Sequence, residues 1–95
     1  MQHRVTQSHL QAVVDRINRI TQSPMVPYAK DADGKHIAQI GNYHLSGAYG
    51  GVCLHRMQND GGGVSSPLSS GHITNRQLLD LMYAYIQGLN EVAAK

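Results

Sequence analysis

The stretch Lys35–Gln58, KHIAQIGNYHLSGAYGGVCLHRMQ, constrains the fold of this chain most strongly. It has β-like patterning interrupted by glycines, and a segment with helical periodicity lies on each side of it. Two amphipathic helices can bury their apolar stripes together on one face of a small sheet. The sequence therefore predicts an α+β fold: a two-layer sandwich with the order helix, three or four antiparallel strands, helix, and with both helices on one sheet face.

The first helix is predicted over residues 6–22. Thr6 is a suitable N-cap, and Val5 before it can pack onto Leu10 at the fourth helical position. A proline excludes the preceding residue from the α region, so Pro24 should end the helix. The apolar residues recur at helical spacing as one stripe. This stripe comprises Leu10, Val13, Val14, Ile17 and Ile20.

The second helix is predicted over residues 75–90. Thr74 and Gln77 have the spacing of a capping box, and Ile73 before them can pack onto Leu78. Gly88 weakens this helix by about 1 kcal/mol relative to alanine or marks its fraying end. The broad apolar face comprises Leu78, Leu79, Met82, Tyr85, Ile86 and Leu89.

A β-meander is predicted over residues 25–58. Pro27 cannot donate to a strand ladder, which indicates an edge strand, and Asp31–Gly34 supplies the residues of a hairpin turn. Gly41 interrupts the alternation of the next strand, so we expect a bulge or kink there. Residues 46–51, SGAYGG, form a second tight connection. The predicted strands cover residues 25–30, 35–46 and 52–58.

A flexible Gly/Ser loop is predicted over residues 59–72. It contains the stretch NDGGGVSSPLSS, which holds too little apolar surface to order itself at low cost. The loop either links the meander to the last helix or orders on binding. The 95 residues suit a single domain, residues 1–95.

Charge and cysteine content narrow the function classes. Charged residues make up 15% of the chain, below the usual ~25%, and the net charge is +2, which disfavours a strongly basic nucleic-acid binder. One cysteine cannot form an intrachain disulfide, and no apolar run approaches the length needed to span a bilayer. With no signal-like N-terminal segment, we expect a cytoplasmic protein without a membrane contact or a cofactor.

The first functional hypothesis is a non-enzymatic interaction module. The exposed sheet face and the glycine-rich loops would bind a protein partner or a second copy, and a homodimer would add burial to a small domain. Tyrosine and arginine are enriched where contacts carry binding energy. The candidate partner-binding residues are Tyr43, His44, Tyr49, His55 and Arg56.

A Cys53-centred enzyme or metal site is one alternative. Cys53 and His55 are two residues apart on one strand and share a face, and His44 lies on the neighbouring strand. These side chains are zinc ligands, or a nucleophile and its base, if they meet in space. Neither a second cysteine nor an orienting group is evident, so we predict no metal, no catalytic residue and no enzyme activity.

Nucleic-acid binding is another alternative. The helix–three strands–helix order resembles the double-stranded-RNA-binding domain, and Pro27, Tyr28 and His36 are similar to that family's β-region. The resemblance implies phosphate contacts from the start of the last helix, but residues 74–77, TNRQ, hold one basic residue where the family has a lysine cluster. The candidate contacts then lie on the first helix and its N-terminal side: Arg4, Arg16 and Arg19.

The run GNYHLSGAYGGVCLHRMQNDGGGV, residues 41–64, followed by a short helical ending, resembles small accessory proteins of unknown function encoded by bacteriophages and prophages. The resemblance covers the C-terminal two-thirds of the chain and implies no catalytic residue. It implies a bacterial cytoplasm and a partner-binding role, such as modulation of a host protein.

Overall fold

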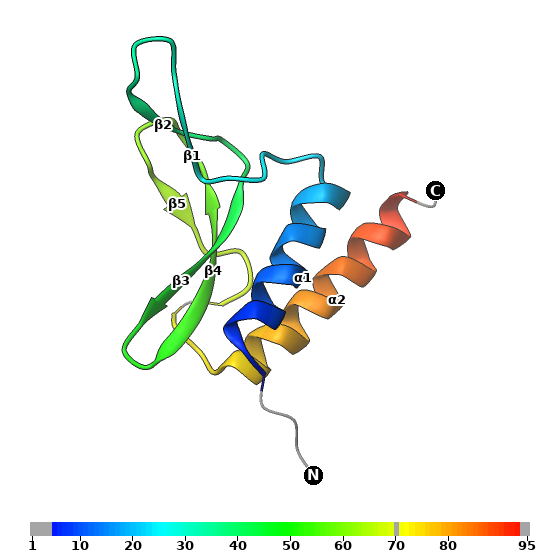
Figure 1. Ribbon diagram of the computed structural model, residues 1–95. Helices are drawn as coiled ribbons and strands as arrows, with labels where there is room; N and C mark the ends of the chain where they lie inside the picture. The colour runs from blue at the N-terminus through cyan, green and yellow to red at the C-terminus, as the bar shows by residue number, and fades with distance from the viewer. Residues whose placement is uncertain (1–4, 70, 94–95) are drawn as a thin grey trace.

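The computed structural model describes residues 5–69 and 71–93, and in this part of the chain two helices pack against a β-sheet (Figure 1). Both helices lie on the same side of the three-stranded sheet, α1 against β3 and α2 against β4. The predicted α+β class with both helices on one face is confirmed. The elements are α1 (Gln7–Ile20), β1 (Tyr28–Lys30), β2 (His36–Ala38), β3 (Tyr43–Ala48), β4 (Gly51–Met57), β5 (Val64–Ser65) and α2 (Asn75–Ala93).

The core fills the space between the two helices and the inner face of the sheet. Its side chains come from the predicted stripes of both helices and from the middle of β3 and β4. Burial of these apolar groups is what holds the two layers together. The members with at most 1% of their surface exposed are Leu10, Val14, Ile17, Tyr43, Leu54, Leu78 and Met82.

Helix α1 begins as the sequence predicted. The Thr6 hydroxyl accepts a hydrogen bond from the His9 N–H at 3.1 Å, and Val5 before the cap is buried in the core. The helix ends at Ile20, two residues earlier than predicted, because Gln22 has a φ of +57°. A left-handed residue at this place ends an α-helix.

Helix α2 carries the predicted capping box. The Thr74 N–H donates to Gln77 Oε1 and the Gln77 N–H donates to Thr74 Oγ1, both at 3.1 Å. The helix runs through Gly88 to Ala93, three residues beyond the predicted end. Packing of Ile86, which is 3% exposed, stabilises these turns enough to offset the ~1 kcal/mol cost of one glycine.

The predicted strand over residues 35–46 is wrong as a single strand. Its first part, β2, pairs with β1, whereas its second part, β3, pairs with β4 in a separate sheet of order β3-β4-β5. Gly41 lies between the two parts with a φ of +92°, and its N–H donates to the Met57 carbonyl at 2.8 Å. The glycine therefore redirects the chain from one sheet to the other and is not a bulge within one strand.

The β1–β2 hairpin confirms the turn predicted at Asp31–Gly34. The Asp31 carboxylate accepts hydrogen bonds from the N–H groups of Asp33 and Lys35, both at 2.9 Å. Gly34 completes the turn with a φ of +80°. An aspartate that bonds the backbone two residues on is the usual way to stabilise such a turn.

The β3–β4 hairpin ends in a two-residue turn. Ala48 pairs with Gly51, and the turn residues Tyr49 and Gly50 have φ values of +54° and +74°. Positive φ at both positions defines a type I′ turn, whose twist matches that of the strands. Figure 1 shows the distal end of this hairpin at the lower left, clear of both helices.

The loop predicted over residues 59–72 contains the short strand β5. Asn59 Oδ1 accepts hydrogen bonds from the N–H groups of Gly61 and Gly63 at 3.0 and 2.9 Å, and this turn brings Val64 beside Met57. Hydrogen bonds from a side chain to the nearby backbone order this glycine-rich turn, although its composition alone predicts a flexible loop.

A backbone bridge ties the start of α2 to the hairpin. Ile73 and Val52 exchange both hydrogen bonds, each at 2.8 Å. A Cβ on Gly51 would lie 2.9 Å from the Ile73 carbonyl oxygen, so this close passage of the chain requires glycine. Neither helix in the described residues is both long and apolar enough to cross a membrane.

Candidate interaction surface on the outer face of the hairpin

Cross-strand pairing divides the predicted partner-binding residues between the two faces of the sheet. Tyr43 pairs with Arg56, and this pair shares the inner face with the core residue Leu54. His44 pairs with His55, and this pair lies on the outer face, away from the helices. The predicted set therefore does not form one surface.

Tyr43 lies in the core, so the prediction that it contacts a partner is wrong. It is 1% exposed, and its hydroxyl lies 2.5 Å from that of Tyr85 on α2. Burial and this hydrogen bond raise the pKa of Tyr43 to about 12, against the opposing charge of Arg56. The Gly41 turn sets the strand facing that puts this ring inside.

Arg56 extends over the edge of the core on the inner face. Its guanidinium carbon lies 4.9 Å from the centre of the Tyr43 ring, and its Nε donates to the Gly41 carbonyl at 3.4 Å. Such stacking is a cation–π contact that holds the side chain in place. Arg56 is thus separated by the sheet from His44 and His55.

Three partly buried histidines form a row across the outer face. The ring centres of His44 and His55 are 5.7 Å apart, and those of His55 and His72 are 6.4 Å apart. His44 Nδ1 lies 3.1 Å from the Asn42 side-chain oxygen, and His72 Nε2 lies 3.4 Å from the Ser46 hydroxyl. The row joins β3, β4 and the segment that precedes α2.

The surroundings of His44 and His55 favour their neutral forms. Burial lowers the pKa of His44, and the charge of His55 lowers it further. The pKa of His55 is lowered by its own burial and then by the charge of His72. At neutral pH His44 and His55 are therefore uncharged rings whose nitrogens can form hydrogen bonds.

Tyr49 extends the histidine row to the tip of the hairpin. Its side chain is 98% exposed, and its ring centre lies 6.1 Å from that of His72. The predicted residues His44, Tyr49 and His55 are therefore brought together on the outer face, with His72 as a further member. We refer to these four residues as the aromatic strip.

His72 is not among the predicted site residues, because it lies at the end of the predicted flexible loop. The bridge between Val52 and Ile73, which are twenty-one residues apart in the chain, places His72 beside β4. No local pattern marks this contact. The sequence shows here only a histidine two residues before a capping box.

Cys53 lies beneath the segment that follows β5. It is 1% exposed, and its Sγ lies 3.5 Å from the Ser66 hydroxyl and 3.7 Å from the Ser69 hydroxyl. Within residues 5–69 and 71–93, no three His, Cys, Asp or Glu side chains are grouped so that they could hold a metal ion. A thiol covered in this way suits a small core residue better than a nucleophile.

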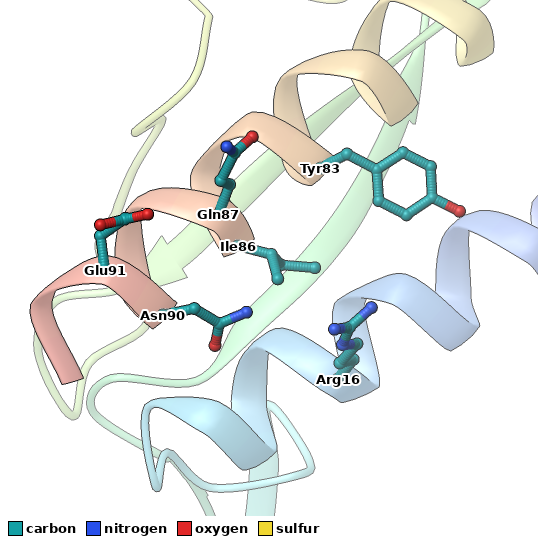
Figure 2. Close-up of a pocket in the computed structure, with 6 residues that line it drawn as sticks. All are labelled: Arg16, Tyr83, Ile86, Gln87, Asn90 and Glu91. Carbon is teal, nitrogen blue, oxygen red and sulfur yellow. The ribbon is translucent and has the colours of Figure 1, made fainter. Parts of the chain in front are cut away.

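The arginines of the nucleic-acid alternative do not form a cluster that the structure describes. Arg4 lies outside the described residues, and Arg19 is exposed in the last turn of α1. Arg16 borders a groove of about 340 Å³ between the two helices (Figure 2). The groove is also lined by Tyr83, Ile86, Gln87, Asn90 and Glu91 of α2.

Figure 2 shows Arg16 and Asn90 reaching toward the gap between the helices from opposite sides. Glu91 brings a negative charge to the same groove, which opposes the binding of a phosphate backbone.

Comparisons with protein-family models, with curated proteins and with solved structures found no match for the chain.

Proposed function

We propose that the protein is a small non-enzymatic interaction module that binds a protein partner through the aromatic strip. Tyr49 carries the proposal. A tyrosine with a φ of +54° costs about 1 kcal/mol relative to a residue that suits this turn, and a 98% exposed ring contributes little to the core. Local conflicts with the fold are expected where a residue serves a contact.

The chemistry of the aromatic strip indicates the kind of partner. Its imidazole rings and the Tyr49 phenol offer flat apolar area together with hydrogen-bonding groups, as protein-binding surfaces do. The strip contains no lysine or arginine, so a phosphate-rich ligand is disfavoured. We propose a protein surface with exposed apolar side chains and polar groups at its rim.

The setting of this activity is also a proposal. The resemblance of residues 41–64 to phage and prophage accessory proteins supports a bacterial cytoplasm and a host protein as the partner. The partner should therefore be present in a bacterial lysate.

The test is affinity capture from bacterial lysate, with and without nuclease treatment, using the wild type, Tyr49→Asn and Tyr83→Asn. Tyr83 is the matched control, since it is a 43% exposed tyrosine on α2, away from the sheet. A protein captured by the wild type and Tyr83→Asn, but lost with Tyr49→Asn, would support the proposal. Equal capture by all three proteins would reject this surface, and a signal abolished by nuclease would favour the nucleic-acid alternative.

A further inference from the structure

Strand β3 has a free edge whose open part is short and well defined. It is the outer strand of the β3-β4-β5 sheet. Tyr43 directs its backbone groups away from β4, because its N–H and carbonyl both bond to the side chain of Asn18. In an antiparallel ladder this direction alternates, so Leu45 and Gly47 also direct their N–H and carbonyl groups outward.

These outward groups are open to a partner strand. Asn18 covers the edge at Tyr43, while no backbone or side-chain hydrogen bond in residues 5–69 and 71–93 covers it at Leu45 or Gly47. Gly47 is exposed, and the tip of the hairpin stands clear of α1 and α2 (Figure 1). Two N–H and two carbonyl groups are therefore available.

The sequence of β3, YHLSGA, lacks the usual protection of an edge strand. Natural sheets block free edges with lysine, proline, inward-pointing charges or bulges. Strand β3 contains no lysine, acidic residue or proline, and its six residues pair with β4 without interruption. These features favour the pairing of this free edge with another strand.

We infer that the β3 edge binds β3 of a second copy in antiparallel register, with a two-fold axis at Ser46. This register pairs Leu45 with Gly47 of the second copy and Gly47 with its Leu45, which uses all the open groups in four hydrogen bonds. On the inner face, Leu45 of each copy lies opposite Gly47 of the other copy, which has no side chain. The two three-stranded sheets become one continuous sheet.

The same register also places the tip of the hairpin beside the second copy. In the same register, Ala48 lies opposite His44 of the second copy, and Tyr49 follows it. The Tyr49 ring, which sits by His72 on the outer face, is thereby brought to the edge of the other aromatic strip. A heterologous peptide would explain the open edge but not this match of the two ends.

The first test uses light scattering of the purified protein over a concentration series. The wild type should approach the mass of two chains. Gly47→Pro removes the outward N–H, and hence two of the four hydrogen bonds, so it should weaken self-association by about tenfold or more. Gly47→Ala keeps the N–H and has room for its methyl group, since the nearest atom is 3.8 Å from the added Cβ. It should associate as the wild type does.

The second test fixes the register by disulfide cross-linking. A Cys53→Ser background removes the native thiol, which lies opposite Ser46 on β4. Ser46→Cys places two cysteines across the axis at a Cα separation of ~4.5 Å, which a disulfide can span. In Ala48→Cys, the matched control, the two cysteines are offset by four residues, or ~13 Å. Oxidised glutathione should link only the Ser46→Cys dimer.

A wild type that keeps the mass of one chain would overturn the inference, as would equal cross-linking of both cysteine variants or of neither. Retained association in a folded Gly47→Pro would also overturn it. Capture of a different protein through Tyr49 is measured separately, in the lysate experiment, so the two proposals fail separately.

Discussion

The side chain of Asn18 occupies the edge of β3 at Tyr43. Its Nδ2 donates to the Tyr43 carbonyl at 3.0 Å, and its Oδ1 accepts from the Tyr43 N–H at 2.8 Å. Asn18 is 1% exposed, so both bonds form away from water. A helix side chain thus replaces a neighbouring strand at one position, and this contact fixes α1 relative to the sheet.

Replacing Asn18 with alanine should destabilise the fold by about 2–4 kcal/mol, because it leaves a buried N–H and a buried carbonyl without partners. Urea unfolding followed by circular dichroism measures this loss. Gln11→Ala, at an exposed position of the same helix, is the control and should change stability by less than about 0.5 kcal/mol. Equal effects of the two substitutions would contradict the role assigned to Asn18.

The histidine row should make stability depend on pH. The folded-state pKa values of His44 and His55 lie below the ordinary value of 6.5, so the unfolded chain takes up protons first as the pH falls. Stability is therefore fully present above about pH 7.5 and is lost as the pH falls through 6.5.

Urea unfolding from about pH 7.5 to 5.5 would detect this loss. The double variant His44→Gln/His55→Gln should have a flatter profile than the wild type, whereas His36→Gln, at an exposed position on β2, should keep the slope. An unchanged slope in the double variant would show that other groups cause it.

The hydroxyl pair of Tyr43 and Tyr85 should behave as one interaction. Tyr43→Phe and Tyr85→Phe each remove the same hydrogen bond, so each should cost about 0.5–1.5 kcal/mol. The double variant should cost little more than either single one, and a double-mutant cycle from urea unfolding measures this coupling. Fully additive losses would contradict a shared hydrogen bond.

Tyr49→Asn should stabilise the isolated protein by about 0.5–1 kcal/mol, because Asn-Gly is the preferred pair in a type I′ turn. Thermal and urea unfolding measure this gain. Tyr49→Ala keeps the same backbone strain and should gain nothing. A variant that is more stable than the wild type but fails to capture the partner would separate a contact role from a folding role, whereas a less stable Tyr49→Asn would contradict the assigned turn.

The starts of both helices were predictable from the sequence because their determinants are local. Thr6 caps α1, and Thr74 with Gln77 caps α2, through bonds that span three residues. The hairpin turn at Asp31 is equally local. These features require no knowledge of what the segments pack against.

The facing of the strands and the aromatic strip were only partly predictable. Gly41 redirects the chain from one sheet to the other. The alternation of apolar residues on either side of it does not predict how far the chain turns there. The candidate set also joined Tyr43 to His44, although neighbours on one strand lie on opposite faces of the sheet. His72 depends on the pairing of Ile73 with Val52, a contact between segments far apart in the sequence.

The division into two sheets gives the β1–β2 ribbon its own place in the order of unfolding. Few bonds join it to the rest of the described chain: the Ala38 N–H reaches the Asp60 carbonyl at 3.4 Å, and the Tyr28 ring lies against Gly62. A segment with so little buried apolar area opens at lower free energy than the core. Its amide protons should exchange with solvent while those of Leu54 and Met82 stay protected, so the molecule loosens first at the ribbon and keeps its helix-covered sheet.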